Sequence, residues 1–344
     1  EEVNPEIKVF TGRVVTGDQF VASKEVKNRI KENFAGLCTE MEGAAIAQVC
    51  HLCDVPFLVV RAISDSPYEK DNHIVFEDFL KKIEADYSKD EDLKLHNTFK
   101  IGGIAKFFVS PSTEEDLKEI LLKCRELDIK HYLLGKGSNV LFSDDLFDGV
   151  IISTAKNFDK ISLISEDMIE CQAGVTLASL CNFALENSFT GFECFYGIPG
   201  TVGGAIITNA GAYGSEVSDV VVEVKHLDEN LDFGSYIGDE IEFSYRRSAY
   251  ETNNFTICSV VFVCEKGNKD EIKAKMDDLI QRRKDKQPLE YPSAGSTFKR
   301  PVGYYAGALI EQSNLKGVTI GGAQVSEKHA GFIINIGGAT THDI

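Results

Sequence analysis

A glycine-rich stretch without a single charge constrains the fold of this chain most. Residues 197–214 contain six glycines interleaved with apolar residues, in the segments Gly197–Ala205 and Asn209–Gly214. A flexible linker would carry serine and charged residues instead. Glycine in a buried context usually means that the backbone closely approaches another group. The flat ring and pyrophosphate of a flavin nucleotide fit that need, and tight backbone packing without a ligand is the alternative.

A second glycine loop, Gly135–Asn139, directly follows the expected strand His131–Leu134. Its two glycines allow successive backbone N–H groups to converge on an anion, and its serine and asparagine add donors. We expect Val140–Phe142 to continue as a strand, so the loop differs from the dinucleotide motif that opens a helix. A pyrophosphate is the expected ligand, although a tight hairpin without a ligand would read the same way.

Polar and cationic residues follow in two further segments, Phe243–Ser248 and Ser293–Pro301. In the second, Ser296 follows a glycine and precedes Lys299 and Arg300, so its hydroxyl can be held and its proton made available. Lysine and arginine can also hold a diphosphate. Taken alone, a serine in such a segment is more often a turn residue.

These segments, with two others, resemble the UDP-N-acetylenolpyruvoylglucosamine reductase family (UDP-N-acetylmuramate dehydrogenase, MurB). The motifs occur in family order and cover residues 90–344; they read N-T-F-K-I-G-G, G-K-G-S-N-V-L-F, I-P-G-T-V-G-G-A, N-A-G-A-Y-G, S-Y-R-R-S, A-G-S-T-F-K-R-P and G-G-A-Q-V-S-E-K-H-A-G-F-I-I-N. The resemblance implies an FAD-binding α+β domain of the PCMH/vanillyl-alcohol-oxidase type. A separate α+β substrate-binding domain would follow it.

The resemblance also implies a reaction, the reduction of UDP-N-acetylglucosamine enolpyruvate with FAD and NADPH in peptidoglycan precursor synthesis. Ser296 would protonate the substrate and Arg246 would polarise its carboxylate. The implied substrate contacts are Tyr245, Lys286, Lys299 and Arg300. The implied FAD contacts are Gly135, Lys136, Gly137, Ser138, Asn139, Gly197, Ile198, Pro199, Gly200, Gly203, Gly204, Asn209, Gly211, Ala212 and Gly214.

The first 85 residues alternate between strand and helix patterns, which predicts an α/β layer. Lys8–Gly17 has an extended pattern, and the apolar run Pro56–Ile63 is typical of a buried strand. Helices are expected at Ser23–Asn33, Gly43–His51 and Phe76–Asp86.

The motifs T-G-D-Q-F, E-M-E-G-A-A-I-A-Q-V-C and V-P-F-L-V-V-R-A-I-S-D resemble 5′-methylthioadenosine/S-adenosylhomocysteine nucleosidase, a nucleosidase-phosphorylase-type fold. The nucleosidase-like residues are Phe20, Glu40, Met41, Glu42 and Asp65. The resemblance makes Asp65 the general acid, Glu42 a ribose ligand and Phe20 a stacking residue. From the residues alone, Asp65 as a helix cap, Glu42 as a helix-terminal charge and Phe20 as core remain open. The family's other catalytic carboxylate is absent, so we expect no nucleosidase activity.

Charge and composition exclude several classes of protein. The net charge of −18 argues against non-specific nucleic-acid binding, which needs a basic surface. No apolar run approaches the length of a membrane span. Nine scattered cysteines, with a lone C-x-x-C at Cys50 and Cys53, predict reduced thiols, a cytoplasmic location and no metal site.

The chain is long enough for two or three domains. We expect a partial nucleosidase-like segment at 1–87, a charged linker at 88–96, an FAD-binding domain at 97–266 split near 154, and a substrate-binding domain at 267–344. Both ends look cut, and a second catalytic glutamate of the reductase family would lie beyond Ile344. We therefore expect weakened FAD binding and reduced turnover. A hydrolase fragment and an inactive fusion product are the alternatives, and the oligomeric state stays open.

Overall fold

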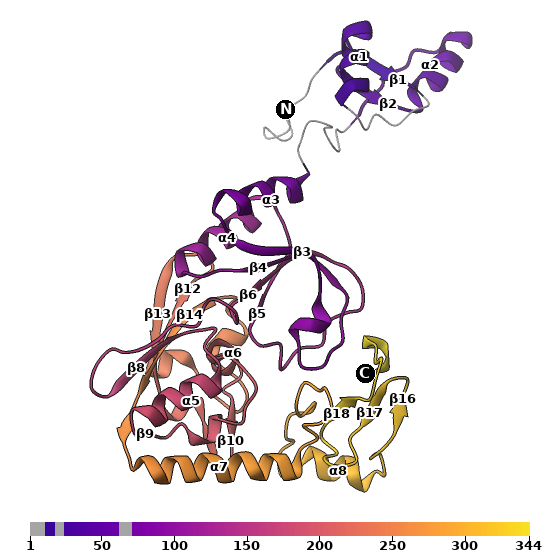
Figure 1. Ribbon diagram of the computed structural model, residues 1–344. Coiled ribbons are helices and arrows are strands. Elements are labelled where there is room, and N and C mark those ends of the chain that lie inside the picture. The colour runs from indigo at the N-terminus through magenta and orange to yellow at the C-terminus, as the bar shows by residue number, and fades with distance from the viewer. Residues whose placement is uncertain (1–10, 18–23, 62–70) are drawn as a thin grey trace. The chain divides into compact units, whose positions relative to one another are not determined.

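The computed structural model describes residues 11–17, 24–61 and 71–344, which form two compact units, 1–77 and 78–344 (Figure 1). The fold is mixed α/β and α+β, as the sequence predicts. No helix in these described ranges is both long and apolar enough to cross a membrane.

The first unit contains a short parallel pair of strands. Strand β1 (Val14–Thr16) pairs with β2 (Cys38–Glu40), and helix α1 (Lys24–Phe34) connects them. Helix α2 (Gly43–Leu52) follows, close to its expected bounds.

The buried strand expected at 56–63 is wrong over the residues that the structure describes. Residues 56–61 form no strand, and Leu58 and Val60 are 85% and 80% exposed. A buried strand needs a partner on each side, and within the described part of this unit only β1 and β2 pair. The apolar run has the composition of a strand, but its described residues have no sheet to join.

Helix α3 (Asn72–Lys82) crosses from the first unit into the second. Beyond it, the segment 88–96 is not a linker. It continues strand β3 (Asp86–Asp92) and then forms the 3₁₀ helix η1 (Leu93–His96). Strand β3 lies at the edge of its sheet, where charged side chains prevent pairing with other chains. The charge run that resembled a linker is therefore the signature of an edge strand.

The first sheet of the second unit has the order β3-β4-β6-β5. Strands β4 (Ile104–Ser110), β6 (Phe147–Ser153) and β5 (His131–Leu134) are parallel, and β3 is antiparallel to β4. Helix α4 (Glu114–Glu126) starts at a Thr113–Asp116 capping box and buries one apolar face. Residues 140–142 do not continue β5 as expected, because the chain leaves the sheet after the Gly135–Asn139 loop.

The second sheet is antiparallel, with the order β13-β12-β14-β8-β7. Its strands are β7 (Ile161–Leu163), β8 (Met168–Gln172), β12 (Val221–Leu227), β13 (Phe233–Ile237) and β14 (Thr256–Val263). Short elements between them are α5 (Leu177–Glu186), β9 (Phe189–Thr190), η2 (Glu193–Phe195), α6 (Val202–Ile207), β10 (Gly211–Ala212), β11 (Ser215–Glu216), η3 (Val217–Asp219), η4 (Gly238–Ile241), η5 (Ala249–Glu251) and β15 (Glu265–Lys266).

Helix α7 (Lys269–Lys286) packs on α5 and η2 and leads to a small third sheet (Figure 1). That part comprises α8 (Ala306–Gln312), β16 (Thr319–Ile320), β17 (Ala323–Val325), β18 (Ile333–Asn335) and η6 (Thr341–Asp343). Hydrogen bonds join it to the start of the first sheet. Thr98 Oγ1 donates to the Ser293 carbonyl at 2.7 Å, and Asn335 Nδ2 donates to the Phe99 carbonyl at 3.1 Å.

Two adjacent glycines of α6 differ in the space around them, which gives a stability prediction. A Cβ at Gly203 would lie 2.9 Å from the Cβ of Ala173, whereas a Cβ at Gly204 would have its nearest neighbour, Thr201 Oγ1, at 3.5 Å. We expect Gly203→Ala to destabilise the fold by about 1–3 kcal/mol through overpacking. Gly204→Ala is the control and should be neutral or slightly stabilising. Thermal denaturation of both variants checks this, and equal midpoints would contradict it.

Candidate active site

The second unit contains a cavity of about 690 Å³, here called the Ser296 cavity. Residues from several segments line it. These include Asn139 from the first glycine loop, Tyr245 and Arg246 from the segment before η5, and the run 296–300. The structure therefore brings Ser296, Arg246, Tyr245, Lys299 and Arg300 together, although they are up to 55 residues apart in sequence.

Ser296 lies at a sharp bend whose preceding residue, Gly295, has a φ of +83°. The segment is fixed on both sides, because Ser296 forms an antiparallel bridge with Phe332 and Thr297 N donates to the Gly331 carbonyl at 2.9 Å. The Ser296 side chain is exposed to the cavity, and its Oγ has no hydrogen-bond partner in the described ranges. The hydroxyl is thus held in place by backbone pairing while its proton stays available.

Gly331 lies beside this hydroxyl. A Cβ at position 331 would lie 3.1 Å from both Ser296 Oγ and the imidazole Cε1 of His329. His329 Nδ1 accepts a hydrogen bond from Gly331 N at 3.1 Å, which leaves Nε2 to carry the proton of the neutral ring. The imidazole also packs edge-on against Phe332. His329 also lines the cavity.

Arg246 occupies a strained backbone position. Ser244 and Arg247 exchange both backbone hydrogen bonds, at 3.0 and 3.1 Å, so Tyr245 and Arg246 are the two corner residues of a tight turn. Arg246 has a φ of +55°, a conformation that favours glycine or asparagine at the second corner. A strained non-glycine residue in a cavity wall is typical of functional sites.

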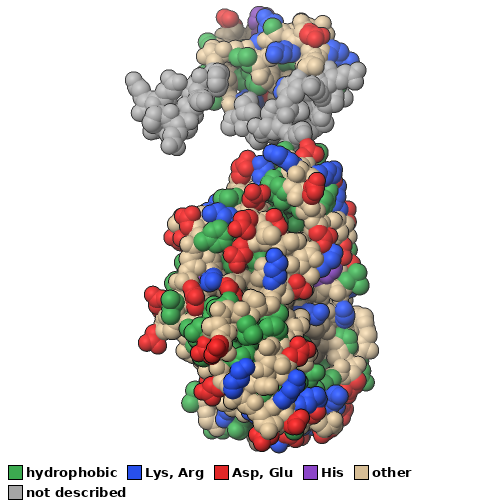
Figure 2. All heavy atoms as spheres, turned by 60° about the vertical axis from the view of Figure 1, so that its left-hand side comes forward, with side chains coloured by type: hydrophobic (Ala, Val, Ile, Leu, Met, Phe, Trp, Pro, Cys, Tyr) green, Lys and Arg blue, Asp and Glu red, His purple; other side chains and the backbone are tan. Residues whose placement is uncertain are grey.

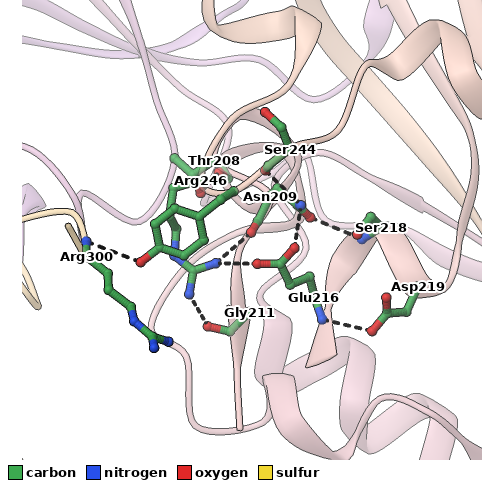
Figure 3. Close-up of polar contacts among 11 residues, drawn as sticks. Thr208, Asn209, Gly211, Glu216, Ser218, Asp219, Ser244, Arg246 and Arg300 are labelled. Atoms are coloured by element: carbon green, nitrogen blue, oxygen red, sulfur yellow. Dashed lines mark hydrogen bonds and ion pairs between the residues drawn. The ribbon is translucent and has the colours of Figure 1, made fainter. Parts of the chain in front are cut away.

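The Arg246 guanidinium is held by three acceptors (Figure 3). Nη1 donates to the Asn209 carbonyl at 2.9 Å and to Glu216 Oε1 at 3.2 Å, and Nη2 donates to the Gly211 carbonyl at 2.7 Å. Of its five N–H donors, the Nε–H and one Nη2–H have no protein partner among the described residues. Two such donors match the two oxygens of a carboxylate.

Aromatic and cationic side chains line the rest of the cavity. Tyr245 accepts a hydrogen bond from Arg300 N at 3.4 Å, and the Arg300 guanidinium lies 4.1 Å from the ring centre of Tyr305. Lys299 Nζ lies 3.7 Å from Glu251 Oε1. These cations, with Lys316 and Lys328 across the cavity, form a surface suited to a diphosphate.

The glycine loop 135–139 presents unpaired donors. No protein acceptor in the described part of the chain receives the backbone N–H groups of Lys136, Gly137, Ser138 and Asn139. Gly137 has a φ of +65°, and a Cβ there would lie 2.2 Å from the His96 carbonyl oxygen. Successive unpaired N–H groups around such a glycine form an anion-binding nest.

A second cavity of about 610 Å³, the Gly135 cavity, adjoins this loop. It is lined by Gly135, Lys136 and Pro199, among others. The two glycine-rich segments touch here, since a Cβ at Gly135 would lie 2.4 Å from Thr201 Oγ1. Thr201 is buried and caps α6 by accepting from Gly204 N. The loop 135–139 and the segment 197–214 therefore both line the Gly135 cavity, which agrees with a site for a pyrophosphate.

The other residues of the segment 197–214 differ in what surrounds them. The Gly197 carbonyl accepts from Arg283, a residue of α7 whose pKa is lowered by burial. Gly214 has open space where a Cβ would be, a Cβ at Gly200 would lie 3.5 Å from Ser138 Oγ, and Gly203 packs on Ala173. Ile198, Gly204, Gly211 and Ala212 lie in the turn, helix and hairpin around them.

The side chain of Asn209, an expected cofactor contact, is bonded within the protein. It is buried, its Nδ2 donates to Glu216 and to the Ser244 carbonyl, and its Oδ1 accepts from the N–H of Ser218. Lys286, an expected substrate contact, is exposed at the end of α7 and lines neither cavity, so its role stays a prediction. Lys328, which donates to the Lys284 carbonyl at 2.7 Å, lines the Ser296 cavity instead.

Sequence reasoning missed Glu216 altogether. It follows the N-A-G-A-Y-G motif by two residues and is the first charge after a long uncharged stretch, a signal that could have identified it. It also missed Lys316 and Tyr305, whose approach to the cavity depends on the fold of residues 305–316.

On the face shown in Figure 2, acidic and basic side chains of residues 78–344 are interspersed rather than gathered into one large patch. The cations that line the Ser296 cavity belong to a chain whose net charge is −18.

In the first unit, Glu40 is the centre of the nucleosidase-like motif. It accepts from Glu42 N at 2.9 Å and from Gly43 N at 2.8 Å, and also from Thr16 and Arg61. Met41 and Glu42 are exposed, and the Glu42 side chain makes no cap hydrogen bond. Phe20 and Asp65 lie outside the described residues. The carboxylate at the start of α2 is thus Glu40 rather than Glu42.

This network predicts an unusual titration. The Thr16 hydroxyl, then the amides of Glu42 and Gly43 and the Arg61 guanidinium, lower the Glu40 pKa from 4.5 to about 2. Since the folded pKa is depressed, its stabilising effect is present above pH 4.5 and is lost as pH falls toward 2. The carboxyl carbon of Glu40 should titrate near pH 2 by NMR, and Thr16→Val should raise that midpoint. A midpoint near 4.5 in the unsubstituted chain would contradict the network.

Comparisons with known proteins match three parts of the chain. The FAD binding domain profile matches residues 105–230, the UDP-N-acetylenolpyruvoylglucosamine reductase C-terminal domain profile matches 287–344, and the phosphorylase superfamily profile matches 1–89. The third match agrees with the resemblance of the first unit to a nucleosidase.

Whole-chain relatives point to one family. The chain is 47% identical to the UDP-N-acetylenolpyruvoylglucosamine reductase of Caldanaerobacter subterraneus, over 78% of this chain and 88% of that protein. It is 43% identical to the Clostridium novyi protein of the same name, with the same coverage. The crystal structure of the Thermus caldophilus enzyme matches with a TM-score of 0.65 and 32% identity, over 75% of this chain and 91% of that one. This chain therefore belongs to the UDP-N-acetylenolpyruvoylglucosamine reductase family.

Proposed function

We propose that this chain is an FAD-dependent reductase that uses NADPH to convert UDP-N-acetylglucosamine enolpyruvate to UDP-N-acetylmuramate, a step of peptidoglycan precursor synthesis. Family membership supports the reaction. The observation that carries it to specific residues is the Ser296 cavity, in which an unpaired serine hydroxyl and two unpaired Arg246 donors line one space. A substrate with a carboxylate and a carbon that must be protonated needs that pair of groups.

The residues present fit FAD. The nest at 136–139 would hold its pyrophosphate, and the open space beside the backbone of Gly214 leaves room for a flat ring. When bound, FAD supplies the hydride that passes from NADPH to the substrate.

The chain's own residues then bind the substrate and complete the reaction. Arg246 donates two hydrogen bonds to the enolpyruvyl carboxylate, which draws negative charge away from the neighbouring carbon-carbon double bond. Ser296 donates its hydroxyl proton to C2 after C3 has received the hydride. Lys299 and Arg300, with Tyr245 beside them, bind the diphosphate of the nucleotide.

Flavin spectroscopy tests this function. The purified chain, titrated with FAD, should gain an absorbance band near 450 nm that NADPH removes. Adding UDP-N-acetylglucosamine enolpyruvate without oxygen should restore the band, whereas UDP-N-acetylglucosamine should not. A chain that binds no FAD, or whose reduced flavin ignores the enolpyruvyl compound, would refute the proposal.

The thiols support a reducing compartment, and we propose the cytoplasm, where NADPH and nucleotide sugars are available. All nine cysteines are free. Burial raises the pKa of Cys124 and Cys258 to about 12, which makes both thiols unreactive toward oxidation. Location of a tagged chain by cell fractionation would test this, and recovery outside the cytoplasm would contradict it.

A further inference from the structure

The residues that accept hydrogen bonds from Arg246 also bond to one another and to the turn that carries Arg246 (Figure 3). Glu216 accepts from Arg246 Nη1 through Oε1 and from Asn209 Nδ2, at 2.8 Å, through Oε2. Asn209 Nδ2 also donates to the Ser244 carbonyl at 3.1 Å, two residues before Arg246. The backbone and the side chain of Arg246 are therefore tied to the same two residues.

Asn209 is itself fixed. It is 1% exposed, has a φ of +40°, and its Oδ1 accepts from the N–H of Ser218 at 3.2 Å. Glu216 is held in turn, because its N–H donates to Asp219 at 3.0 Å in the turn that starts η3. The buried amide of Asn209 holds the Glu216 carboxylate in one orientation. Glu216 in turn binds Nη1 of Arg246, so this nitrogen is not free for a ligand.

We infer that Asn209 and Glu216 are positioning residues: they bind the Nη1 side of the Arg246 guanidinium so that Nε–H and one Nη2–H remain for the carboxylate of a ligand in the Ser296 cavity. The inference rests on the proposed function, in which that carboxylate belongs to the enolpyruvyl group. Neither residue needs to touch the ligand for this role.

Charge alone predicts the opposite effect. The Glu216 carboxylate is negative and lies 3.2 Å from Arg246, so it would repel a bound carboxylate and weaken its binding. Removing Glu216 should then tighten binding if charge dominates, and should loosen it if orientation dominates. The sign of the change therefore separates the two effects.

Binding measured without turnover tests the inference. The FAD-loaded chain, without NADPH, is titrated by calorimetry with UDP-N-acetylglucosamine enolpyruvate and with UDP-N-acetylglucosamine, which lacks the carboxylate. The ratio of the two dissociation constants is the carboxylate preference. We expect Glu216→Ala to lower this preference roughly tenfold, the order of one charge-assisted hydrogen bond. Glu265→Ala removes an exposed carboxylate in β15 and should leave the preference unchanged.

Two further variants keep the test decisive. Glu216→Gln has one side-chain acceptor in place of two, so it can receive from Arg246 or from Asn209 but not from both. Its preference should fall between those of the unsubstituted chain and Glu216→Ala, and it carries the test alone if the alanine variant does not fold. In an Arg246→Ala background, Glu216→Ala should cause no further loss, because a positioning residue acts only through Arg246.

The outcomes are distinct. A preference that is retained or increased in Glu216→Ala and Glu216→Gln overturns the inference, as does a further loss in the Arg246→Ala background. No preference in the unsubstituted chain would instead mean that the proposed function fails at the carboxylate site, and the inference would fail with it. Lowered preference with unchanged binding of UDP-N-acetylglucosamine supports it.

Discussion

Replacing Ser296 with alanine is expected to lower the rate of substrate reduction by about 10²–10⁴-fold, the usual contribution of a general acid. The hydroxyl is aligned by the bridge to Phe332 and has no competing acceptor among the described residues, so alanine removes the proton with little change in packing. Stopped-flow absorbance separates the two half-reactions. Bleaching of FAD by NADPH should keep its rate, and only the return of the 450 nm band on adding the enolpyruvyl substrate should slow.

Ser296→Cys provides the matched variant, because a thiol can also donate a proton and should recover part of the rate. Equal rates for the alanine variant and the unsubstituted chain would remove Ser296 from the chemistry. Slowing of both half-reactions would instead mean that the substitution disturbs the flavin site.

Substitutions of Arg246 are expected to give the second large loss of activity. The glycine and alanine variants should lose similar activity but differ in stability. Arg246→Gly and Arg246→Ala both remove the guanidinium, and each should lower turnover by about 10²–10³-fold, the loss typical of one preorganised donor. At a φ of +55°, however, glycine avoids the strain that alanine retains. We expect Arg246→Gly to be more stable than Arg246→Ala by up to about 1 kcal/mol.

The neighbouring residue is the control for this difference. Arg247 has no positive φ, so Arg247→Gly should be less stable than Arg247→Ala. Denaturant titration of the four variants measures both signs. The same sign at both positions would show that the turn does not strain Arg246.

The sequence identified two residues that the structure brings together, but it could not predict which groups each side chain contacts. Ser296 and Arg246 lie in short motifs with unusual composition, and the structure places both in one cavity. Lys286 belongs to a motif as well, but a helix-terminal side chain can point in any direction, and in the structure it lines neither cavity. The family resemblance implied that Asn209 contacts the cofactor, and only the fold shows its amide bonded to Glu216.

Fold prediction from the sequence failed where a pattern depended on distant partners. The run 56–63 has strand composition, yet its described part pairs with nothing, because pairing depends on neighbours and not on composition alone. The charged segment 88–96 was predicted as a linker but continues a strand, because an edge strand and a linker can have the same charge pattern. Helix α4, by contrast, carries its start signal locally, in the capping box of Thr113 and Asp116, so its start depends on no distant partner.

The hydrogen bonds from Thr98 to Ser293 and from Asn335 to Phe99 also bear on how this protein is made. They join residues 195 and 236 positions apart, so the segment that carries Ser296 cannot be fixed until the end of the second unit has been synthesised. Contacts of such long range slow folding, because a large loop must close before they form. The first and second sheets can assemble on the ribosome early, whereas the Ser296 hydroxyl is set in place only after the third sheet has been synthesised.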